Sequence, residues 1–124
     1  MVRDPRRLKA FQEADALVVV TYRLTVELPD QERFGLQSQL RRAAVSVATN
    51  LVEGSARQSA RDYSRFLEIA RASSCECGYL LELCVRLGYL QPAALETSRR
   101  YEGLSAGLLA AASRIRALDA AESE

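Results

Sequence analysis

The sequence predicts an all-α protein, an antiparallel up-down-up-down four-helix bundle formed by a single domain over residues 1–124. Apolar residues make up 48% of the chain, with only 6 Gly and 3 Pro, which is typical of a protein with a packed core. Ala, Leu, Arg and Glu dominate while β-branched runs are rare, which favours helix. Apolar residues recur at three- and four-residue steps along four segments, and short breaks separate these segments.

The first two helices are expected over residues 8–28 and 35–57. Pro29 ends the first, because the residue before a proline disfavours helical backbone. Gly54 and Ser55 loosen the end of the second. The inner stripe of this second helix is formed by Leu36, Leu40, Ala43, Val47, Asn50, Leu51 and Gly54.

The other two helices are expected over residues 60–88 and 92–118. Ser59 and Asp62 have the spacing of a capping box, in which both side chains satisfy free amides at a helix start. Gly88 is a suitable residue for ending the third helix. Helices of this length with short connections predict the bundle.

The balance of charge and the residue types present argue against catalysis and against a general basic coat. Lys and Arg number 17 against 16 Asp and Glu, and His is absent, so the commonest general base and metal ligand is missing. A carboxylate mechanism at Glu53 or Glu68 is chemically possible, but no partner at a suitable spacing indicates it. We therefore expect a non-enzymatic protein with no catalytic residue, no cofactor and no metal.

The three cysteines lie in the third predicted helix and are expected to be free thiols. Cys75 and Cys77 point to nearly opposite sides of the helix, and Cys77 and Cys84 are two turns or about 10 Å apart, beyond disulfide reach. Free thiols indicate a reducing cytoplasm. No segment resembles a signal peptide or approaches the length of a membrane span, so we expect a cytoplasmic protein with no membrane partner.

Several helices carry more apolar surface than one core face uses, which predicts self-association. A second apolar stripe on the third helix is rotated about 100° from the first, and two valines of the second helix lie opposite its inner stripe. The expected interface residues are Val45, Val52, Leu80, Leu83 and Leu87. The alternative is a broad core edge shielded by loops and Arg stems.

Two polar residues of the second helix are expected to be buried, namely Asn50 and Glu53. A buried Asn50 amide either orients a ligand or fixes helix register, as a single buried Asn does in coiled coils. Glu53 stands four residues before Arg57, a spacing that supports an ion pair on the helix surface.

Arginines predict a candidate nucleic-acid or phosphate site on the second and third helices. Its members are Arg41, Arg42, Arg57, Arg61 and Arg65, and Arg3, Arg6, Arg7 and Lys9 extend it. The start of a helix adds positive potential to such a patch. The alternative is a solvated charged face.

Residues 38–70, SQLRRAAVSVATNLVEGSARQSARDYSRFLEIA, together with the later RLGYL, resemble small four-helix-bundle proteins encoded in intervening sequences of bacterial 23S ribosomal RNA genes. The resemblance implies a homopentamer around a central axis. It extends to the accessory variability determinant proteins of diversity-generating retroelements, which associate with a reverse transcriptase and nucleic acid through a strongly basic pentamer. This chain departs from that pattern because its net charge is only +1.

These observations favour a cytoplasmic homo-oligomeric interaction module, with the pentamer implied by the resemblance. The alternative is an accessory protein that binds nucleic acid through the arginines of the second and third helices. The expected partners are other copies of the chain, with RNA, DNA or another protein as the alternatives.

Overall fold

A computed structural model of the protein describes residues 3–123, which form four α-helices and three short 3-10 helices with no β-strand among them. The predicted all-α class is confirmed. The α-helices are α1 (Lys9–Thr25), α2 (Leu36–Ser55), α3 (Ala60–Arg86) and α4 (Leu95–Ser123). The 3-10 helices are η1 (Pro5–Arg7), η2 (Asp30–Glu32) and η3 (Pro92–Ala94).

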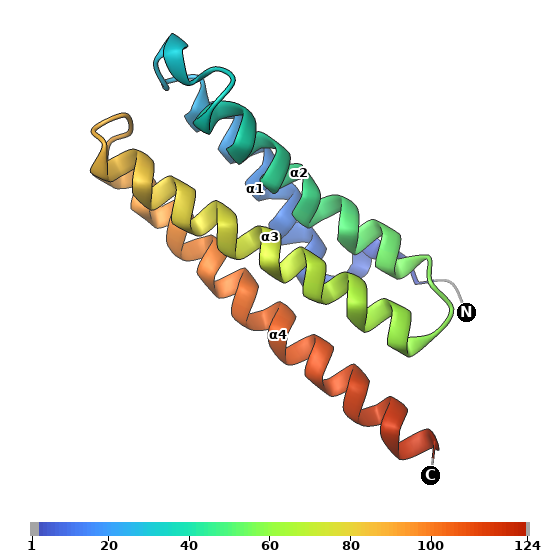
Figure 1. The fold of residues 1–124 in the computed structure, drawn as a ribbon. Helices are drawn as coiled ribbons and strands as arrows, with labels where there is room; N and C mark the ends of the chain where they lie inside the picture. Colours follow the sequence, from blue (N-terminus) through green and yellow to red (C-terminus); the bar gives the residue numbers. More distant parts are fainter. Residues whose placement is uncertain (1–2, 124) are drawn as a thin grey trace.

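The four helices enclose one apolar core. α1 packs against α2 and α4, and α3 packs against the same two helices. Figure 1 shows the connections after α1 and after α3 at one end of the molecule, and the connection after α2 at the other end. The side chains that fill the centre completely include Leu17, Leu40, Val47, Leu51, Leu81 and Leu108.

The helix ends follow the local signals of the sequence. The Ser59 hydroxyl accepts a hydrogen bond from the backbone N–H of Asp62 at 3.0 Å, which caps α3 and confirms the Ser59 half of the predicted capping box. The Asp62 carboxylate lies 3.9 Å from Arg65 instead. Gly88 has a φ of +78°, the left-handed conformation that a glycine adopts most easily just beyond a helix. α1 ends at Thr25 rather than at residue 28, and α4 begins at Leu95 because Pro92 lies in η3.

A buried polar network joins three of the helices. The hydroxyls of Thr21 and Tyr101 are 2.6 Å apart, and the Tyr101 hydroxyl also donates to the backbone carbonyl of Leu17 at 3.3 Å. Ser74 of α3 donates to the backbone carbonyl of Tyr101 at 2.8 Å. Because each of these groups is shielded from water, the bonds fix the lengthwise position of α1 and α3 against α4.

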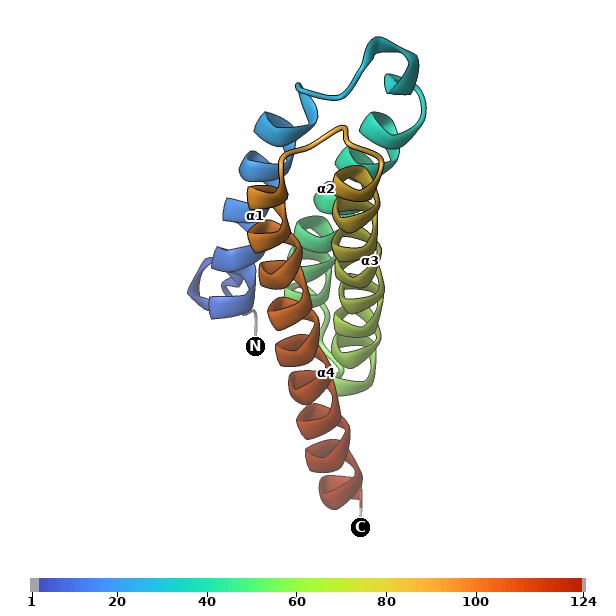
Figure 2. The same ribbon diagram turned by 90° about the vertical axis from the view of Figure 1, so that its left-hand side faces the viewer.

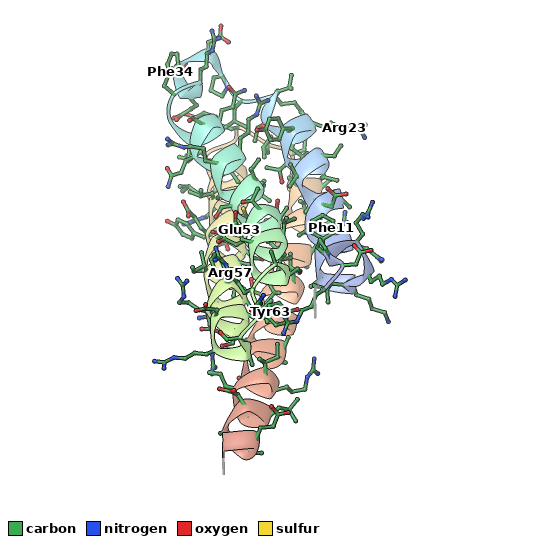
Figure 3. The ribbon with its side chains drawn as sticks, turned by 90° about the vertical axis from the view of Figure 1, so that its right-hand side faces the viewer. Phe11, Arg23, Phe34, Glu53, Arg57 and Tyr63 are labelled. Atoms are coloured by element: carbon green, nitrogen blue, oxygen red, sulfur yellow. The ribbon has the colours of Figure 1, made fainter. Side chains whose placement is uncertain are left out.

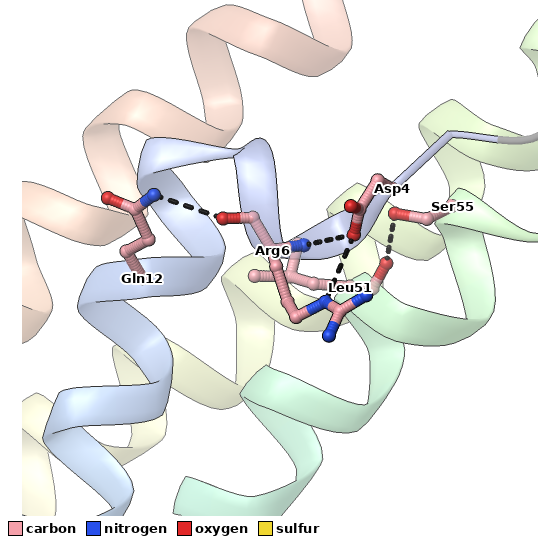
Figure 4. Close-up of polar contacts among 5 residues, drawn as sticks. All are labelled: Asp4, Arg6, Gln12, Leu51 and Ser55. Carbon is pink, nitrogen blue, oxygen red and sulfur yellow. Dashed lines mark hydrogen bonds and ion pairs between the residues drawn. The ribbon is translucent and has the colours of Figure 1, made fainter.

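The segment before α1 is held against the end of α2. The Asp4 carboxylate accepts a bond from the backbone N–H of Arg6 at 3.0 Å, and Gln12 donates to the Arg6 carbonyl at 3.0 Å (Figure 4). Nearby, the backbone N–H of Arg3 donates to the carbonyl of Ser55 at 3.4 Å. This segment therefore adds arginines to the end of the molecule where α2 passes into α3.

The three cysteines are free thiols, as predicted, and only Cys75 is exposed. Burial raises the pKa of Cys77 from 9.0 to about 12 and that of Cys84 to about 11. Both buried thiols therefore stay protonated and unreactive at neutral pH.

Thiol labelling checks this arrangement. An aromatic disulfide reagent at mildly alkaline pH is expected to modify Cys75 alone in the folded protein and all three thiols in denaturant. The Cys75→Ser variant is the control, and it should lose the single fast reaction. Rapid modification of three thiols in the folded state would contradict the packing of α3.

No helix within residues 3–123 combines the length and apolar character needed to cross a bilayer.

Candidate interaction surface

Exposed apolar side chains follow the outward side of α2 and α3, and we call this surface the α2–α3 outer face. It comprises Val45, Val52, Ile69, Leu83 and Leu87. Val52 is 45% exposed and Leu87 is 51% exposed, whereas Leu83 is half-buried against the core. The core behind these residues is already filled, so the chain offers them no further partner of its own.

Leu80 does not belong to this surface, which corrects the prediction. Its side chain is only 4% exposed and packs in the core of the chain. α3 packs against both α2 and α4, so more of its surface is buried than the one stripe of residues that faces a single neighbouring helix. Leu80 falls within that buried surface and is unavailable to a second copy.

A short polar row runs between α2 and α3 beside the valines. The hydroxyls of Ser46 and Ser73 are 2.8 Å apart, and the Asn50 amide donates to the carbonyl of Ser46 at 2.8 Å and to its hydroxyl at 3.1 Å. Asn50 is half-buried rather than fully buried, which corrects the prediction. It lies at the edge of the α2–α3 contact and ties this edge together through Ser46.

Glu53 is exposed, so the prediction that it is buried was wrong. Its carboxylate accepts a bond from Arg57 at 3.1 Å, the ion pair expected from their spacing, and its side chain is 59% exposed. In Figure 3, Glu53 near the end of α2 and Arg57 just beyond that end lie close together, far from the exposed Phe34 in the connection after α1. A long charged side chain beside a core stripe reaches water by bending outward.

Arginines stack on aromatic rings where α2 passes into α3, and we call this group the arginine–aromatic cluster. The guanidinium groups of Arg57 and Arg65 lie 4.8 Å and 4.7 Å from the centre of the Phe66 ring. Arg3 lies 4.2 Å from the centre of the Tyr63 ring and donates to the Arg57 carbonyl at 2.7 Å. These distances are within the range of cation–π attraction.

The structure brings together three of the five predicted arginines and separates the other two. Arg61 is exposed in the first turn of α3, between the cluster members Arg57 and Arg65. Arg41 lies about 24 Å away along α2, where it stacks on Tyr22 and donates to the Thr25 hydroxyl at 2.9 Å. Arg42 is exposed beside it. Arg41 therefore joins α2 to the end of α1.

The carboxylates considered for catalysis are paired with arginines. Glu68 lies 3.4 Å from Arg71 and 3.9 Å from Arg116, and Glu53 is paired with Arg57. Among residues 3–123, no group of three or more His, Cys, Asp or Glu side chains is placed to hold a metal ion. The best-formed feature of this side of the molecule is therefore an apolar face with a short polar row, beside an arginine–aromatic cluster.

The features that carried the resemblance lie on this face and at its end: Ser46, Asn50 and Glu53, the close turn after Gly54, and Phe66 under its two arginines. A family model described as 23S rRNA-intervening sequence protein matches residues 6–109. The chain belongs to this family. Among curated proteins, none matches the chain. The family match spans α1, α2 and α3 and ends within α4, so the last turns of α4 lie beyond it.

Proposed function

We propose that this member of the 23S rRNA-intervening sequence family is a non-enzymatic homo-oligomeric interaction module of the cytoplasm, built from antiparallel up-down-up-down bundles. The placement of successive connections at alternate ends of the molecule supports the up-down order. Three free thiols suit a reducing compartment. The resemblance described above supports five copies around an axis.

The observation that carries this proposal is the apolar α2–α3 outer face over an already filled core. Val45, Val52, Ile69 and Leu87 are between 36% and 51% exposed, whereas Leu40, Val47 and Leu51 directly beneath are fully buried. Aligned exposed apolar residues on two neighbouring helices are typical of a subunit contact, whereas scattered ones are not. The side-chain oxygen of Asn50 accepts no hydrogen bond within residues 3–123, so it offers an acceptor to a docking copy.

Substitution of Val52 by arginine tests the proposal. We expect the Val52→Arg variant to lower the mass measured by light scattering from that of the oligomer towards 13.7 kDa, because a charge must then be desolvated in the contact. Val19→Arg is the matched control, since Val19 is a valine of similar exposure, 48%, on α1. Far-ultraviolet circular dichroism checks that both variants remain helical. An unchanged mass for Val52→Arg would count against this face.

The arginine–aromatic cluster favours a second function, binding of single-stranded nucleic acid as an accessory protein. Arg57 and Arg65 are held on the Phe66 ring, and Arg61 is exposed between them with no ion pair to another residue in 3–123. Guanidinium groups presented in this way suit phosphates, and their flat outer surfaces suit stacking on bases. The weak net charge of +1 limits such binding to this local patch.

Salt dependence of binding tests this alternative. If the cluster binds nucleic acid, the Arg61→Ala/Arg65→Ala double variant should bind a labelled single-stranded RNA or DNA more weakly, and its salt slope should fall by about 2. The control is Arg33→Ala/Arg99→Ala, which removes the same charge from exposed positions outside the cluster. An equal loss in both variants, or no binding at low salt, would reject the alternative.

A further inference from the structure

An apolar groove with a volume of about 590 Å³ lies between the start of α1 and the middle of α4. Leu51 of α2 and Leu67 of α3 form its floor, and Leu104 and Leu108 line the α4 wall. Lys9 stands on the α1 wall. Because most of its lining residues belong to α1 and α4, the groove lies on the α1–α4 side of the molecule, and no member of the α2–α3 outer face lines it.

Two glycines leave the α4 wall of this groove without side chains. A Cβ atom added at Gly103 or at Gly107 would meet nothing within 4 Å. Glycine inside a helix is unfavourable compared with alanine, and here the packing of the chain itself does not require it. The pair therefore leaves a strip of bare helix backbone that another helix can approach closely.

The last turns of α4 extend beyond the rest of the molecule. Hydrogen bonds from Ser98 to Gly78 and from Ser74 to Tyr101 set the register of α3 and α4, which places the first residue of α3 level with about residue 115. α4 continues to Ser123, and Figures 1 and 2 show this end projecting alone. Leu118, in the projecting part, is 65% exposed.

The projecting residue and the groove lie on the same stripe of α4. Steps of three and four residues connect Arg100, Gly103, Gly107, Ala111, Arg114 and Leu118. All of these except Leu118 line the groove. One helix therefore carries an unfilled groove at its middle and an unburied leucine on the same side near its end.

We propose that two copies of this chain dock through antiparallel contact of their α4 helices, with Leu118 of each copy filling the groove beside Gly103 of the other. A two-fold axis near Ala111 brings these positions together in both directions at once, as a self-complementary contact requires. The bare backbone at the two glycines lets the helices approach closely enough for the leucine to enter.

Charge supports a second copy as the occupant of the groove. The same pairing sets Glu122, which lies one turn beyond Leu118, level with Arg100 of the other copy, whose guanidinium already pairs with Glu13 at 2.7 Å. Lys9 is exposed on the rim and makes no ion pair with another residue in 3–123, so it adds positive charge where the acidic end of α4 arrives. This contact is separate from the α2–α3 outer face and does not depend on it.

Cysteine trapping tests the pairing in the full chain. With Cys75→Ser as background, the Leu118→Cys/Gly103→Cys variant should form a covalent dimer under mild oxidation, because only close helices bring the two Cα atoms within disulfide range. The matched control is Leu118→Cys/Ala106→Cys, since Ala106 is exposed on another side of α4. We expect dimer formation at least about tenfold faster in the first variant, because docking raises the effective thiol concentration.

A second experiment distinguishes this α4 contact from docking through the α2–α3 outer face. Leu118→Arg alters an exposed residue and should lower the mass of the assembly measured by light scattering without loss of helix content. The trapped dimer should still form when Val52→Arg is added to the cysteine pair. Equal rates of covalent dimer formation in the cysteine pair and its control, or an unchanged mass for Leu118→Arg, would overturn the proposal. The groove would then be a binding site for a small apolar ligand instead of a second copy.

Discussion

A chain carrying Gly54→Val is expected to lose about 3 kcal/mol of unfolding free energy, through overpacking between α2 and α3. A Cβ atom at Gly54 would lie 2.9 Å from Cβ of Phe66, closer than folded proteins allow, and 3.2 Å from Cδ1 of Tyr63, which is tighter than most Cβ contacts. Phe66 Cβ is fixed to the α3 backbone, so relief requires the two helices to separate. The separation would also disturb the stacking of Arg57 and Arg65 on Phe66.

Urea unfolding followed by circular dichroism measures this loss. The matched control is Ala106→Val, which adds a branched side chain at an exposed position of α4 and should change stability by less than about 1 kcal/mol. All variants are compared at one protein concentration, because assembly shifts apparent stability. Equal stability of Gly54→Val and the parent protein would show that the helices do not approach as closely as described.

The second large effect is expected at Tyr101, the buried side chain that connects α1 and α4. Tyr101→Phe removes a hydroxyl that lies 2.6 Å from that of Thr21 and donates to the Leu17 carbonyl, and it leaves both of these buried groups without this partner. The expected loss is about 2 kcal/mol. Burial also raises the pKa of Tyr101, so its hydroxyl stays protonated and able to donate.

A double-mutant cycle with Thr21→Val checks the physical reason. Each single substitution leaves a buried polar group without its partner, whereas the double variant removes both hydroxyls of the pair. The double variant should therefore lose less than the two single losses combined, by about 1 kcal/mol or more. Strictly additive losses would mean that the two hydroxyls do not act as a pair.

The helices were predictable because their signals are local. The apolar spacing, the Ser59 cap and the Gly88 end depend on residues within a turn or two of one another, and the structure has each of them. The exposure of Val45 and Val52 was also predictable, because both lie opposite the inner stripe of the same helix.

Features that depend on pairs of helices were not predictable from these patterns. Leu80 is buried because α3 has neighbours on two sides, which a stripe on one helix does not reveal. The bond between Thr21 and Tyr101 joins residues 80 positions apart. The groove depends on where α1 begins beside α4, and the only signal for it in the sequence is the unexplained pair Gly103 and Gly107 within a helix.

Docking of copies through the α2–α3 outer face is the central claim, and the mass of the native assembly tests it most directly. Sedimentation equilibrium from micromolar to millimolar concentration should give a multiple of 13.7 kDa, with five copies expected from the resemblance, and Val52→Arg should reduce it. A parent protein that sediments at 13.7 kDa throughout this range, with Val45 and Val52 in water, would contradict the claim.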